Sequence, residues 1–154
     1  MSTTKAVRNA IVARLATING AAGGYTYNLS GTDQALSGKY SRPPGSASAP
    51  FACCWTVSVE ESPGPPLPDK SQLGTFMVLG WVRASAKHPS ARQDAAEDLL
   101  DDIRTALRAD PRLGGLVIDM RASGAPFEDE RDQTPDQATW GVCAVSIAAS
   151  WRER

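Results

Sequence analysis

GTFMVLGWVRA, residues Gly74–Ala84, is the stretch that decides the fold. It predicts a β-strand that is apolar on both faces, because neighbouring residues of a strand point to opposite sides of a sheet. Phe76, Val78 and Val82 share one face, and Met77, Leu79 and Trp81 share the other. Such a strand lies in the middle of its own sheet, or a second protein covers one of its faces. The central position is the simpler hypothesis, and the covered face is its alternative.

Two amphipathic helices are predicted on either side of this strand. Downstream, Ser90–Arg108 carries apolar residues three and four positions apart, which place one buried stripe on a helix. Upstream, Thr4–Ile18 has the same spacing, and Ser2, Thr3 or Thr4 can cap its start. The stripes consist of Ala96, Leu99, Leu100, Ile103 and Leu107 in the first helix and of Val7, Ile11, Leu15 and Ile18 in the second.

Four more strands and three long loops complete the pattern. The strands are expected at Tyr25–Leu29, Phe51–Glu60, Leu116–Arg121 (with Leu116, Ile118 and Met120 inward) and Thr139–Trp151. The loops are expected at Gly31–Pro50, at the proline-rich Glu61–Leu73 and at Ala122–Gln137. The sequence therefore predicts a single α+β domain over residues 1–154, with a mostly antiparallel sheet, both helices packed on one of its faces, and long projecting loops.

Composition narrows the function classes. The 154 residues hold 16 Lys and Arg against 17 Asp and Glu, so the formal net charge is -1. This balance argues against sequence-specific nucleic-acid binding, which needs clustered positive charge. No apolar run approaches the roughly 20 residues of a membrane span. The three cysteines include the adjacent pair Cys53 and Cys54, which indicates buried free thiols in a reducing cytoplasm.

Motifs for catalysis, cofactors or metals are not found. His88 is the single histidine, and a lone histidine before a helix is more often a solvated turn residue than a general base. The segment ending in Gly38 and Lys39 has the wrong glycine spacing for a phosphate-binding loop. We therefore expect no enzymatic activity, no catalytic residue, no cofactor and no metal site.

An acidic face is predicted on the helix Ser90–Arg108. It consists of Asp94, Glu97, Asp98, Asp101 and Asp102. Three interpretations are open: a solvated surface, an ion-pair surface between subunits, and a metal or catalytic site. The first is the commonest use of such a surface, and the second would pair these carboxylates with arginines of a neighbouring copy.

Four segments resemble the phage tail terminator family. They are VRNAIVARLATI (residues 7–18), AEDLLDDIRTAL (96–107), ADPRLGGLVIDMR (109–121) and SIAASWRER (146–154). The resemblance is one of architecture over nearly the whole chain. The long Gly31–Pro50 and Glu61–Leu73 segments depart from it, which leaves open which loop meets which partner.

The resemblance implies a structural protein of the virion tail, assembled in the host cytoplasm. It implies a hexameric ring that caps the tail tube, ends its polymerisation and joins the tail to the head connector. The expected partners are other copies of the chain, the tail tube protein and the connector. Candidate interface residues are Trp81, Asp94, Asp98, Asp101, Arg104 and, in the proline-rich loop, Pro66. The alternatives are another head–tail connector, a tail-tube subunit, and a small hydrolase or metal-binding enzyme that uses the acidic face.

Overall fold

The computed structural model of the chain describes residues 2–22, 24–40, 50–61, 71–84, 89–127 and 140–152. In these ranges the fold consists of two α-helices and five β-strands. They are α1 (Thr3–Leu15), β1 (Ala35–Ser37), β2 (Phe51–Glu61), β3 (Ser71–Arg83), α2 (Pro89–Ala109), β4 (Asp119–Phe127) and β5 (Trp140–Arg152). Two short 3₁₀ turns, Gly20–Ala22 and Leu113–Gly115, complete the described elements.

All five strands belong to one sheet with the order β1-β2-β3-β5-β4. The pairs β2–β3, β3–β5 and β5–β4 are antiparallel, and only β1 runs parallel to its neighbour β2. The strand predicted from Gly74–Ala84 is β3, and it lies in the middle of the sheet. The α+β class and the central position of this strand are therefore confirmed.

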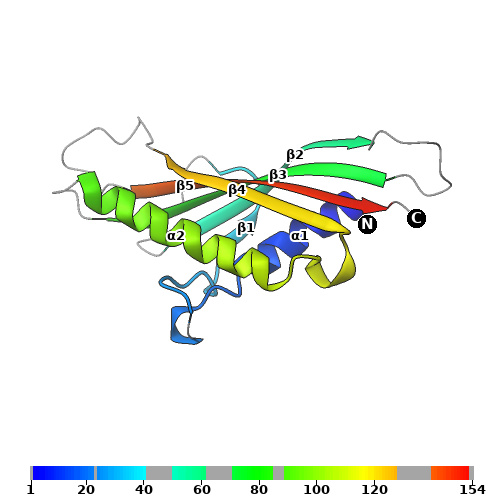
Figure 1. Cartoon of the computed structure of the whole chain (residues 1–154). Coiled ribbons are helices and arrows are strands. Elements are labelled where there is room, and N and C mark those ends of the chain that lie inside the picture. The colour runs from blue at the N-terminus through cyan, green and yellow to red at the C-terminus, as the bar shows by residue number, and fades with distance from the viewer. Residues whose placement is uncertain are drawn as a thin grey trace.

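Both helices lie on the same face of the sheet, as predicted (Figure 1). The core between them contains Val7, Ile11 and Leu15 of α1 and Leu99, Ile103 and Leu107 of α2, all packed against alternate residues of the strands. Ser2 caps α1, because its Oγ accepts a hydrogen bond from the backbone N–H of Lys5 at 3.2 Å. The guanidinium of Arg14 ties the helices together by donating from Nε and Nη2 to the carbonyl of Ala106 in α2.

The prediction of a strand at Tyr25–Leu29 is wrong. Tyr25–Leu29 does not form a strand, and only Asn28 makes an isolated bridge, with Asn19. The first strand is instead β1, which lies inside the segment expected to be the Gly31–Pro50 loop. Tyr25–Leu29 alternates well but is held by other contacts, including a 2.8 Å hydrogen bond from the N–H of Leu29 to the carbonyl of Ile18. Residues 41–49 of that expected loop lie outside the described residues.

The strand predicted at Leu116–Arg121 begins three residues later than expected. Leu116 is 41% exposed and Ile118 is 51% exposed, whereas Val117 between them is buried. The reason is the turn before it, in which Gly114 and Gly115 have positive φ angles of 68° and 94° and change the direction of the chain. Strand β4 starts at Asp119 and continues to Phe127, so the loop expected at Ala122–Gln137 loses its first six residues to the sheet.

The proline-rich segment Glu61–Leu73 is also shorter than predicted at both ends. Glu61 is the last residue of β2 and Ser71 the first of β3, and the two strands are paired there as Glu61 with Gln72. Residues 62–70, which include Pro66, lie outside the described residues, as do residues 85–88 with His88 and residues 128–139.

The three thiols are free and buried, as the sequence predicts. Burial raises the pKa of Cys54 and of Cys143 to about 12 from the ordinary value of 9.0, and it also raises the pKa of Cys53. Above pH 9 the unfolded chain therefore loses thiol protons that the folded chain keeps. The free energy of unfolding is expected to fall with pH in this range, by about 1.4 kcal/mol per thiol and pH unit.

Urea unfolding at pH 8 and pH 10 measures this effect. In the variant Cys143→Ala, the fall between the two pH values is expected to be about 1 kcal/mol smaller than in the wild type. An equal fall in the two proteins would show that the Cys143 thiol ionises as readily in the folded chain as in the unfolded one.

Candidate assembly surfaces

The face of the sheet opposite the helices carries a cluster of aromatic and apolar residues, here called the aromatic face. At its centre, Phe51, Trp81 and Val142 are cross-strand neighbours on β2, β3 and β5, and with Cys53 they are buried. The half-buried residues packed around them are Leu36, Tyr40, Trp55, Leu79 and Trp140. No described helix lies on this face (Figure 1).

Ring stacking holds the aromatic face together. The ring centroids of Phe51 and Trp81 are 5.5 Å apart, and Tyr40 meets Phe51 edge-to-face at 5.4 Å. Cations cover two of the tryptophans. Lys39 Nζ lies 5.6 Å from the ring centroid of Trp55, and the guanidinium carbon of Arg83 lies 5.0 Å from that of Trp140. Trp81 itself is 3% exposed, so Trp55 and Trp140 are the half-buried tryptophans of this face.

One edge of the sheet is open along the outer half of β2. Strand β1 pairs only with Ala52–Cys54, and no described strand continues beside Trp55–Glu61. A β-bulge interrupts the register between Thr56 and Ser58. Around it Val57 is 54% exposed and Val59 is 40% exposed, and these are large apolar residues for a solvated edge. Unprotected edges with apolar side chains favour pairing with another chain.

The acidic face of α2 contains four of the five predicted residues. Asp94, Glu97, Asp98 and Asp101 are exposed, and Glu97 accepts a 3.2 Å hydrogen bond from Gln93. The fifth residue, Asp102, was also predicted to lie on this exposed face, but it is buried, with only 5% of its surface exposed. The interpretation of all five residues as one exposed surface is therefore wrong for Asp102.

Asp102 holds the segment that precedes β1. The backbone N–H of Thr26 donates to Oδ1 at 2.9 Å and to Oδ2 at 3.1 Å, and the N–H of Tyr27 donates to Oδ2 at 2.8 Å. The pKa of Tyr27 is raised, first by burial and then by the carboxylates of Asp98 and Asp102. The carboxylate thus satisfies two backbone groups of a segment that has no neighbouring strand there. This role is structural.

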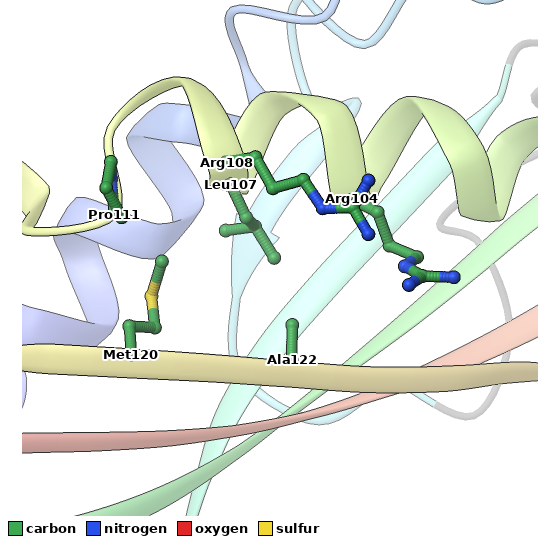
Figure 2. Close-up of a pocket in the computed structure, with 6 residues that line it drawn as sticks. All are labelled: Arg104, Leu107, Arg108, Pro111, Met120 and Ala122. Carbon is green, nitrogen blue, oxygen red and sulfur yellow. The ribbon is translucent and has the colours of Figure 1, made fainter.

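A shallow pocket of about 150 Å³ lies between the C-terminal half of α2 and β4. Figure 2 shows Arg104 and Arg108 extending from α2 in the same direction along the helix, with Met120 and Ala122 pointing from β4 toward α2. Leu107 and Pro111 complete the lining. We call this the arginine pocket. Arg104 was a candidate from the sequence, whereas Arg108 and the two β4 residues were not, although the spacing of four between the arginines is visible in the sequence.

The remaining candidates are placed as follows. Asp94, Asp98, Asp101 and Arg104 lie together along α2, while Trp81 lies on the opposite face of the sheet. Pro66 and His88 fall in segments outside the described residues. Among the residues that the structure describes, no group of three or more His, Cys, Asp or Glu side chains is placed to hold a metal ion. In the same ranges no helix is both long and apolar enough to cross a membrane.

Comparison with known proteins gives no family. The chain matches no family model, and no curated protein matches it.

Proposed function

We propose that this chain is a structural subunit of a phage tail, a tail terminator that forms a ring on the end of the tail tube. In this function it ends tube polymerisation and presents a surface to the head connector. The observation that carries the proposal is the aromatic face. The centre of this face is already buried within the chain, and its half-buried rim, with Trp55 and Trp140, supplies the aromatic side chains that are enriched at protein–protein interfaces.

Two further surfaces support assembly into a ring. A closed ring uses heterologous contacts, in which one surface of a subunit meets a different surface of the next. The chain offers unlike surfaces of this kind: the open edge of β2, with Val57 and Val59 exposed, and the charged side of α2. The near-zero net charge of -1 leaves little overall repulsion between copies.

The rival function is a hydrolase or metal-binding enzyme that uses the acidic face. Such a site needs carboxylates that converge on one point. Asp94, Asp98 and Asp101 instead follow one another along a single helix, and Asp102 is withdrawn from them by its bonds to Thr26 and Tyr27. This arrangement favours a contact surface over a reaction centre.

Electron microscopy of particles made without the protein tests the proposal. In a phage whose gene for this chain is disrupted, we expect tails of uncontrolled length that are not joined to heads. Complementation by the wild type and by the variant His88→Ala is expected to restore normal tails equally, because the proposal gives His88 no chemical role. Tails of normal length in the disrupted phage, or a failure of His88→Ala alone while the variant still folds, would contradict the proposal.

A further inference from the structure

The arginine pocket contains two positive charges that form no ion pair with the described residues. Arg104 and Arg108 are four residues apart, so their guanidinium groups are neighbours on the surface of α2. No ion pair joins either arginine to a carboxylate in the described part of the chain. Two like charges at this spacing repel each other, and a carboxylate between them would remove the repulsion.

The same helix carries the complementary charge. Asp94, Asp98 and Asp101 are spaced by four and three residues, and the series continues through Arg104 to Arg108 with spacings of three and four. These five residues therefore form one stripe on α2, acidic in its N-terminal half and basic in its C-terminal half. Asp101 is three residues before Arg104 and is its neighbour on the helix, but no ion pair joins the two in the described part of the chain. Asp98 and Arg108 are about 15 Å apart along a straight helix, too far for Asp98 to reach the pocket of its own chain.

We infer that the arginine pocket binds the acidic half of α2 from a second copy of this chain. This inference rests on the proposed ring and names one of its contacts. The carboxylates of Asp98 and Asp101 of one copy lie against the guanidinium groups of Arg104 and Arg108 of the next. Hydrogen bonds between these groups are charge-assisted and geometrically specific.

The lining of the pocket suits this occupant. Leu107, Met120 and Ala122 form an apolar floor beside the guanidinium groups, which lowers the access of water to the ion pairs. Ion pairs that are partly withdrawn from water interact more strongly than fully solvated ones. Each copy has one acidic half and one pocket, so a staggered head-to-tail arrangement uses both and extends to further copies.

A charge-swap experiment tests the inference. The acid-reversed variant carries Asp98→Arg and Asp101→Arg, the pocket-reversed variant carries Arg104→Glu and Arg108→Glu, and the full swap carries all four changes. In sedimentation equilibrium at low salt, each reversed variant is expected to raise the dissociation constant for self-association by about 100-fold. The full swap is expected to return it to within about tenfold of the wild type, because the charges are again complementary.

Two controls accompany the swap. The first control reverses the charges of Asp119 and Arg121, an exposed pair on β4 in which Arg121 Nε lies 3.6 Å from Asp119 Oδ2. Because both charges lie away from the stripe, association is expected to be unchanged. Mixing the acid-reversed and pocket-reversed variants is expected to restore association, although each alone associates only weakly. Urea unfolding of each variant confirms that it is folded.

The outcomes separate the inference from the proposed function. If the wild type forms a ring that both reversed variants also form, the ring stands and the inference is overturned. The inference is also overturned if the full swap associates no better than the reversed variants. If the swap behaves as expected but the wild type stops at a two-fold dimer, the inference stands and the ring fails. A wild type that stays monomeric at millimolar concentration overturns both.

Discussion

Replacing Asp102 by alanine is expected to lower the free energy of unfolding by about 3 kcal/mol. The carboxylate accepts hydrogen bonds from the backbone N–H groups of Thr26 and Tyr27, and it is buried. Alanine leaves both N–H groups without this acceptor, in hydrogen bonds that are partly buried. Urea unfolding measures the loss, and hydrogen exchange at Thr26 and Tyr27 locates it, since these amides are expected to lose protection first.

Asp98→Ala is the matched control for this variant. Asp98 lies one helical turn before Asp102 and is exposed, so its loss is expected to change the free energy of unfolding by less than about 0.5 kcal/mol. Asp102→Asn keeps one acceptor oxygen and is expected to fall between the wild type and Asp102→Ala. Equal stability of Asp98→Ala and Asp102→Ala would contradict the structural role of Asp102.

Gly141→Ala is expected to destabilise the fold by about 2–3 kcal/mol. A Cβ at Gly141 would lie 2.6 Å from the carbonyl oxygen of Arg92 and 3.1 Å from the backbone N of Ala96. The N-terminal part of α2 therefore packs directly against the start of β5, backbone to backbone. Since these atoms belong to the helix main chain, they cannot move without displacing α2 from the sheet.

The sign of the stability change in Gly141→Ala distinguishes close backbone packing from an unstrained glycine position. Replacing glycine by alanine at an unstrained position usually stabilises a protein, by about 0.4–1 kcal/mol. On the same strand, Ala148→Val adds two methyl groups at an exposed position and is expected to be nearly neutral. Thermal or urea unfolding compares the two variants. A Gly141→Ala protein as stable as the wild type would mean that α2 does not approach β5 this closely.

The regular elements of this fold could be predicted from periodicity. The stripe of Val7, Ile11 and Leu15 and that of Leu99, Ile103 and Leu107 place both helices within three residues of their observed ends. The run of apolar residues on both faces of Gly74–Ala84 likewise places the central strand. These patterns work because burial on one face of a helix or on both faces of a strand restricts residue types directly.

The errors arise where a distant group decides the local structure. Tyr25–Leu29 alternates like a strand, but Asp102, about 75 residues away, binds the backbone N–H groups of Thr26 and Tyr27 instead of a neighbouring strand. The sequence also predicted that Asp102 is exposed. Its two hydrogen-bond donors are backbone N–H groups, so no residue type in the sequence indicates that the carboxylate is buried and hydrogen-bonded. At Leu116–Ile118 the positive φ angles of Gly114 and Gly115 set the direction of the chain against the apolar pattern.

The candidate site was predictable only in part. The acidic residues and Arg104 stand out in the sequence as charges on an amphipathic helix. The arginine pocket does not, because its floor of Met120 and Ala122 comes from β4, which joins α2 only after the chain turns through Gly114 and Gly115. The aromatic face is similar, since Tyr40, Phe51, Trp81 and Val142 come from separate segments and meet through the strand register.

The mass of the purified wild-type assembly tests the central claim most directly. Native mass spectrometry at micromolar concentration is expected to show a closed species of six copies, six times the 16.3 kDa mass of the chain. Its population is expected to fall as the ionic strength rises, because charged contacts on α2 contribute to it. A chain that remains a monomer at every concentration, or that stops at a dimer, would contradict its assignment as the subunit of a ring.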